Sequence, residues 1–168
     1  MQYLQSDKPA CGSFLDLAPY RDVIGLFASP EVLSRLLLDA VDPTIRALQN
    51  LTITRARLDE ARATQIEGSQ SWGQNSGYLD YVTDCRTPDY WRSYVGQSHN
   101  TPERITQHIR EIRSGASHTL HYFVIKSGGG HRVANFMKLW TLVLPENFDP
   151  IIEDVLTNLL EMAMARSF

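Results

Sequence analysis

"GYLDYVTDCRTPDYWRSYVG", residues 77 to 96, is the stretch that decides the fold of this chain. Two runs rich in aromatic and β-branched residues, 78 to 84 and 91 to 96, flank a segment in which Pro88 and Asp89 mark a turn. This pattern is typical of two antiparallel strands that form a hairpin. Gly96 closes the second strand and lets the chain turn with a close backbone approach.

A helix, an ambiguous segment, a strand and a last helix follow the hairpin. We expect a helix over 101 to 113, because isoleucines recur there at i, i+4 and i+7 and a glycine follows. The next segment, 118 to 130, fits either a strand or a short helix. Residues 132 to 145 predict a long apolar strand, and Asp149 with Pro150 opens a last helix. This order predicts an α+β domain with helices packed on a small, mostly antiparallel sheet.

Residues 13 to 67, ahead of the hairpin, have a helical pattern. Ser29 with Pro30, and Asp42 with Pro43, each place a capping residue before a proline at the first helical position. The second pair opens a stretch that we predict to be helical as far as residue 66. A Gly-, Ser-, Asn- and Gln-rich break then covers 67 to 77. We therefore predict a helical extension or packing arm over 1–70 and the α+β domain over 71–168.

The composition is that of an ordinary globular protein. The chain has 168 residues, of which 43% are hydrophobic and 21% charged, enough for one sizeable core. No apolar run approaches the roughly 18 residues needed to cross a bilayer, and no secretory leader opens the chain. We expect an intracellular protein that does not span a membrane. Cys11 and Cys85 lie far apart and predict neither a disulfide framework nor a structural zinc site.

Basic residues and histidines gather in one part of the sequence. Residues 86 to 132 hold seven Arg and Lys against three Asp and Glu, although the whole chain has a net charge of −3. All five histidines fall in the same window. We expect a local surface that faces anions. The alternative is a chance cluster on a solvated face.

The candidate functional residues of this window are Tyr94, Arg104 and His108. Arg104 and His108 are four residues apart, so they share one helix face beside the isoleucine stripe. Tyr94 comes near them if the hairpin packs on this helix. An arginine can hold a phosphate through two hydrogen bonds, a histidine can relay a proton, and a tyrosine beside cations can act as a base. Together these residues suggest phosphoryl chemistry, although each residue type alone is common in ordinary strands and helices.

The spacing of these residues resembles that of the GIY-YIG nuclease family. "YVG" at 94 to 96 looks like the second signature tripeptide of the family. Arg104 lies ten residues after Tyr94, where the family has its helix arginine, and His108 follows four residues later, as in the homing-endonuclease branch. The resemblance covers roughly residues 77 to 165 and implies the α+β fold of that family.

The first family signature falls on "GYLDYV", which offers two tyrosines. Tyr78 and Tyr81 point to opposite faces of a strand, so only one of them can face a site. We assign Tyr81, because a short aliphatic strand end follows the tyrosine in the family, as in "YVTD". Tyr78 is the alternative.

The resemblance implies a DNA endonuclease that hydrolyses one phosphodiester bond with the help of one metal ion. Glu161, in the last helix, looks like the glutamate that holds Mg²⁺ or Mn²⁺ in the family. Tyr81 or Tyr94 would take the proton of the attacking water, His108 would receive or relay it, and Arg104 would grip the phosphate. A solvated helix face is the other interpretation of Glu161.

DNA is the expected partner, although a pI near 5.9 gives no evident basic module for targeting it. We therefore expect either a homodimer or an additional DNA-targeting domain or partner. The family core continues beyond the glutamate helix, so we expect the chain to be truncated at its C-terminus or to lack that element. Two other functions fit the sequence. One is a catalytically inactive nucleic-acid-binding module derived from the family, and the other is an α+β protein-interaction domain.

Overall fold

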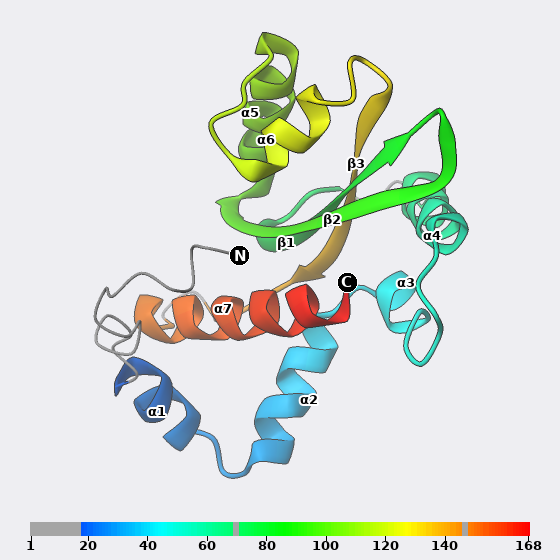
Figure 1. The fold of residues 1–168 in the computed structure, drawn as a ribbon. Coiled ribbons are helices and arrows are strands. Elements are labelled where there is room, and N and C mark those ends of the chain that lie inside the picture. Colours follow the sequence, from blue (N-terminus) through cyan, green and yellow to red (C-terminus); the bar gives the residue numbers. More distant parts are fainter. Residues whose placement is uncertain (1–17, 69–70, 146–147) are drawn as a thin grey trace, which may run out of the picture.

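A three-stranded antiparallel sheet forms the centre of the molecule (Figure 1). The computed structural model describes residues 18 to 68, 71 to 145 and 148 to 168, and Cys11 lies outside them. β1 (Gln74–Asp84) is the middle strand, with β2 (Thr87–Asn100) on one side and β3 (Arg132–Thr141) on the other. Both pairings are antiparallel. The predicted α+β fold is confirmed.

The hairpin of β1 and β2 turns earlier than its sequence predicts. Asp84 pairs with Thr87, so Cys85 and Arg86 form the turn. Pro88 and Asp89 lie in β2 instead. β2 is an edge strand, and a proline without an N–H is tolerated there because one side of the strand has no partner.

Seven helices surround the sheet in the described residues. They are α1 (Ala18–Gly25), α2 (Pro30–Ala40), α3 (Pro43–Arg46) and α4 (Arg55–Glu67) before the sheet, α5 (Thr101–Ser114) and α6 (Leu120–Lys126) between β2 and β3, and α7 (Pro150–Ser167) at the end. α5 and α6 cover one face of the sheet, and α7 packs on the other (Figure 1). The ambiguous segment after α5 is thus a helix, with Thr119 as its N-cap.

The capping residues read from the sequence open their helices as expected. The side chains of Ser29, Asp42 and Asp149 accept hydrogen bonds from backbone N–H groups at the starts of α2, α3 and α7. α5 ends at Gly115, whose φ of 74° places it in the left-handed region that favours glycine. Local sequence therefore determines these helix ends.

The helix predicted from 43 to 66 is broken in the structure. α3 ends at Arg46, and α4 begins only at Arg55 with Thr54 as its N-cap. Asn50, in the connection, has a φ of 64°. Thr52, Ile53 and Thr54 are consecutive β-branched residues, which lose side-chain freedom in a helix, so this stretch favours a break.

One hydrophobic core joins the N-terminal helices to the sheet. Ile45 of α3 and Leu58 of α4 are buried in the same cluster as Leu79, Trp140 and Leu160. A neighbouring cluster joins α1 and α2 to α7. The helices before residue 71 therefore form part of the packing of the sheet. No helix in the described parts of the chain is both long enough and apolar enough to cross a membrane.

Candidate functional site

Polar and aromatic side chains gather between the sheet and the helices α5 and α6. Tyr78 pairs with Gly96, and Asp80 pairs with Tyr94, so the side chains of Tyr78, Asp80 and Tyr94 share one face of the sheet. α5 and α6 place a further set against this face, which consists of Arg104, His108, His121 and Tyr122.

Gly96 makes room for Tyr78 in this cluster. A Cβ atom at position 96 would lie 2.6 Å from the Tyr78 hydroxyl oxygen, which is closer than packed atoms approach. Tyr78 is fully buried, with its ring next to those of Tyr94 and Phe136. Gly96 lies within β2, so the turn expected there is not found, and the close approach at Gly96 is made by a tyrosine side chain.

His108 is held between two tyrosines. Its Nε2 atom lies 2.7 Å from the Tyr78 hydroxyl, and its Nδ1 atom lies 2.9 Å from the Tyr122 hydroxyl. Burial, with smaller contributions from Arg104 and His121, lowers the pKa of His108 to about 4. The imidazole is therefore neutral at pH 7, and both of its nitrogens are engaged. His108 is suited to positioning the two tyrosines.

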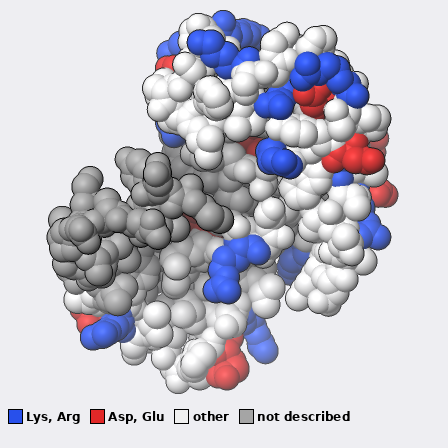
Figure 2. Space-filling model, viewed as in Figure 1, with Lys and Arg blue, Asp and Glu red and all other residues white. Residues whose placement is uncertain are grey.

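Arg104 lines a pocket of about 450 Å³ together with Tyr94 and His121. Its guanidinium interacts with the hydroxyls of Tyr78 and Tyr94, and it donates a hydrogen bond of 2.8 Å to Gln107. Arg92 also lines the pocket, and no Asp or Glu among the described residues does. Figure 2 shows Lys and Arg side chains over the upper part of this view, where Figure 1 places α5 and α6. The pocket is thus suited to an anion.

Asp80 and His121 form a buried pair beside this pocket. Asp80 Oδ2 lies 3.1 Å from His121 Nε2, and both side chains are almost fully shielded from solvent. The contact is not aligned as a hydrogen bond, and neither atom has another partner in the described residues. Asp80 Oδ1 accepts the Asn135 backbone N–H at 3.0 Å. The Tyr94 ring stacks on His121 at 4.6 Å, and His121 lines the pocket whereas Asp80 does not.

Tyr81 lies on the other face of the sheet, contrary to its assignment from the sequence. Its hydroxyl donates a hydrogen bond of 2.8 Å to Asp59 of α4, and its ring belongs to the core with Leu79. Burial, and then the contact with Asp59, raise the pKa of Tyr81. The tyrosine of β1 that faces Arg104 and His108 is Tyr78, the alternative.

Tyr78 itself is poorly suited to act as a base. Burial raises its pKa to about 12, although Arg104 acts in the opposite direction. The expectation that neighbouring cations lower the pKa of the site tyrosine therefore fails for Tyr78, because burial outweighs the charge. Two other tyrosines, Tyr94 and Tyr122, line the pocket, and the Tyr122 hydroxyl is already bound to His108.

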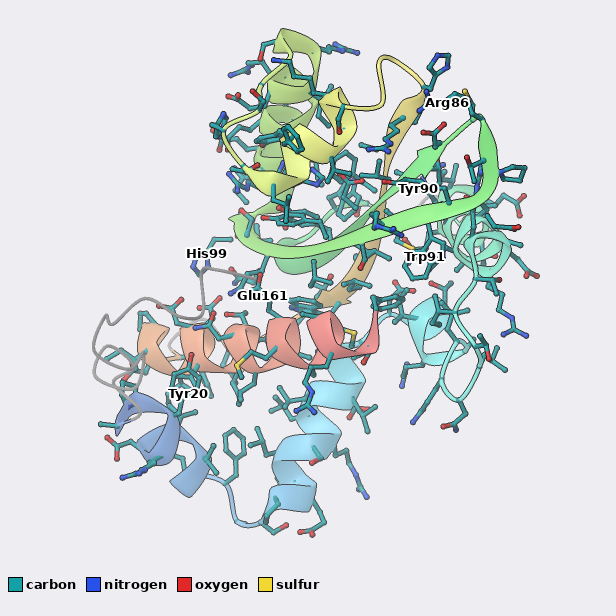
Figure 3. All side chains as sticks on the ribbon, in the orientation of Figure 1. Tyr20, Arg86, Tyr90, Trp91, His99 and Glu161 are labelled. Atoms are coloured by element: carbon teal, nitrogen blue, oxygen red, sulfur yellow. The ribbon has the colours of Figure 1, made fainter. Side chains whose placement is uncertain are left out.

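Glu161 also lies away from the cluster. Gln97 of β2, one residue after Gly96, points to the opposite face of the sheet and donates a hydrogen bond of 3.2 Å to Glu161. Figure 3 shows Glu161 between α7 and β2, on the side away from α5 and α6. Burial raises the pKa of the Glu161 carboxyl, with Gln97 acting against it.

A divalent ion held by Glu161 does not fit a site shared with Arg104, because the sheet separates the two side chains. Among the described residues, no group of three or more His, Cys, Asp or Glu side chains is arranged to hold a metal ion. Asp80 is the carboxylate nearest the pocket, and its two oxygens face His121 and the Asn135 N–H. We therefore derive no chemical step through a metal.

The sequence held signals for the residues that our assignment missed. Asp80 follows Tyr78 by two residues and so shares its face, and an acid within a strand of apolar and aromatic residues indicates a buried partner. His121 belongs to a His-x-x-His pair that lacks a third metal ligand, but its contact with Asp80 depends on how α6 packs. That contact could not be read from local sequence.

No protein-family model, curated protein or solved structure matches this chain. The resemblance to the GIY-YIG family stays a prediction.

Proposed function

We propose that this chain is a DNA endonuclease whose pocket between β2, α5 and α6 binds and hydrolyses a phosphodiester. The observation that carries the proposal is that Tyr94, Arg104 and His121 line one pocket with cationic walls and no carboxylate. A phosphate diester carries one negative charge and gains more during attack by water. Arg104 can stabilise that charge through two N–H groups, most strongly where water is excluded.

The proton of the attacking water passes to a group in the wall of the pocket. Tyr94 and His121 are the candidates, because the other histidine and tyrosine of the lining, His108 and Tyr122, are bound to each other, and Tyr94 and His121 are stacked on each other. Asp80 stabilises the cation that forms if His121 takes the proton, because its carboxylate lies 3.1 Å from the ring. His108 and Tyr78 hold the pocket in shape. The new P–O bond forms as the bond to the leaving oxygen breaks, and the leaving oxygen takes up the proton that the group in the wall accepted from the water.

Dependence on Mg²⁺ or Mn²⁺ is a separate part of the proposal and rests on the family resemblance alone. We give Glu161 no role in it, because Glu161 bonds Gln97 on the other face of the sheet. The placement of Glu161 favours a second candidate function, a nucleic-acid-binding module that keeps the fold without cleavage.

Cleavage of supercoiled plasmid and of branched DNA separates these functions. We expect the parent protein to nick one of these substrates, and Arg104→Ala and Tyr94→Phe to lower the rate. Reactions with Mg²⁺, with Mn²⁺ and with EDTA test the metal. Salt-sensitive binding of DNA without cleavage by a folded parent would favour the binding module.

A further inference from the structure

A second groove lies along β3 on the far side of α5 from the pocket of Arg104. It has a volume of about 510 Å³, and residues of α4, α5, β3 and the segment before β1 line it. We call it the β3 groove. The residues on which the argument rests are Arg62, Trp72, Arg113, Arg132, Phe136 and Lys138.

The β3 groove does not take an added β-strand, because side chains of α4 already bind the backbone of β3 there. Gln65 donates to the Lys138 carbonyl at 2.8 Å and accepts from the Lys138 N–H at 2.9 Å. Arg62 donates to the Phe136 carbonyl at 3.2 Å. An occupant must therefore be recognised by the side chains of the groove.

The charge of the β3 groove favours an anion. Four cationic residues line it, and no Asp or Glu of the described chain does. Two of the four are paired with acids outside the groove. Arg132 lies 3.3 Å from Asp84, and Lys138 lies 3.7 Å from Asp42. Arg62 and Arg113 form no ion pair with any described acid, and Arg113 is exposed. Two cationic charges thus face the groove without compensation.

Aromatic and aliphatic surfaces accompany these charges. Trp72 and Phe136 line the groove and are half-buried. Ile66 and Val133, which also line it, are 61% and 54% exposed. A groove that combines cations lacking an acidic partner with aromatic rings suits unpaired nucleic acid, because the phosphates meet the cations and the bases stack on the rings. An acidic peptide would use the cations but gain less from the rings.

We propose that the β3 groove binds a single-stranded segment of nucleic acid, with Arg62 and Arg113 on phosphates and Trp72 stacked on a base. The choice of nucleic acid rests on the proposed function. Binding of a single strand in the β3 groove would narrow the substrate of the proposed nuclease to DNA with an unpaired segment, such as a branch or flap.

The positions of the two sites on α5 fit one continuous ligand. Arg104 and Arg113 are nine residues apart on this helix, which is about 14 Å along its axis. Phe136 lines the β3 groove, and its ring also lies 5.9 Å from that of His108. A strand held in the groove can therefore reach the pocket of Arg104 around α5.

Binding of a labelled oligothymidylate at low salt tests the groove without any need for cleavage. We expect Trp72→Leu to weaken binding about tenfold, which is the size of one lost stacking contact. Arg113→Glu should weaken it at least as much and should lower its salt dependence. Arg35→Glu, on α2, makes the same charge change far from the groove and should bind like the parent. Circular dichroism checks that each variant is folded.

Tryptophan fluorescence provides a second measurement. Unlabelled oligothymidylate should quench the emission of the parent and of Trp91→Phe, but not that of Trp72→Leu. Equal binding by the parent and both groove variants would overturn the proposal. Displacement of the oligonucleotide by polyglutamate at the same charge concentration would overturn it in favour of an acidic peptide. A further outcome is that the plasmid is nicked in an Arg104-dependent way, but neither the parent nor the variants bind the oligonucleotide. That result would overturn the proposal for the β3 groove and leave the proposed function standing.

Discussion

Gly96 is the residue on which the shape of the site depends most directly. A methyl group there would overlap the Tyr78 hydroxyl. We expect Gly96→Ala to lower the free energy of unfolding by about 1 to 3 kcal/mol, as overpacking does. Urea unfolding measures this loss. Gly25→Ala is the control, because a Cβ at position 25 meets no atom within 4 Å. Equal stability of the two variants would contradict the packing of Tyr78 on Gly96.

His108 makes the stability of the fold depend on pH. Its pKa of about 4 lies below the value of about 6.5 in an unfolded chain. Between these values the unfolded state binds the extra proton, so stability is present above pH 6.5 and is lost as the pH falls toward 4. We expect a loss of about 2 kcal/mol between pH 7 and pH 5 from this group.

Urea unfolding of the parent and of His108→Gln at both pH values checks this. His118→Gln, at an exposed histidine, is the control. Arg104 and His121 lie next to His108 and add to the effect of burial in lowering its pKa. The pH dependence should be smaller in His108→Gln than in the other two proteins. The same slope in all three would show that His108 is not buried in its neutral form.

At the residue scale, the sequence predicts only in part which residues of the hairpin and α5 come together. The contact of Tyr94, Arg104 and His108 follows from helical spacing and one assumption about packing, and the structure brings these residues together. The choice between Tyr78 and Tyr81 needs the face of the sheet on which α5 packs. Local pattern shows that the two tyrosines oppose each other, but not which one meets α5.

At the element scale, α4 protects the outer edge of β3. Gln65 is buried and bonds both backbone groups of Lys138. We expect Gln65→Glu to lower the free energy of unfolding by about 1 to 3 kcal/mol, because the Lys138 carbonyl loses its donor in a buried place. Glu60→Gln reverses the change at an exposed position of the same helix and should be neutral. Matching urea midpoints for the two variants would contradict this role.

Helix ends could be predicted where a capping residue precedes proline, because these signals are local. The break between α3 and α4 was missed, although Thr52, Ile53 and Thr54 signal it, because the apolar stripe continues through it. The position of Glu161 was missed for a different reason. α7 exists and begins as expected, yet the face on which it packs carries Glu161 to the far side of the sheet. That packing depends on contacts distant in sequence.

At the scale of the whole molecule, one core ties the N-terminal helices to the sheet. Leu58 is fully buried among residues of α3, α7 and the sheet. We expect Leu58→Ala to lower the free energy of unfolding by about 2 to 5 kcal/mol. Calorimetry should still show a single transition, because the helices and the sheet unfold together. Leu51→Ala, at a residue that is 45% exposed, is the control. Two separate transitions would contradict a shared core.

The central proposal is that hydrolysis occurs on the face of the sheet covered by α5, which carries Arg104, and not on the face covered by α7, which carries Glu161. The most direct test is the rate at which Arg104→Ala and Glu161→Gln nick supercoiled plasmid under the conditions in which the parent is active. We expect Arg104→Ala to lose at least about 100-fold, as for a lost transition-state contact. Glu161→Gln should keep the rate of the parent. Loss of nicking in Glu161→Gln with an unchanged rate in Arg104→Ala would contradict the claim.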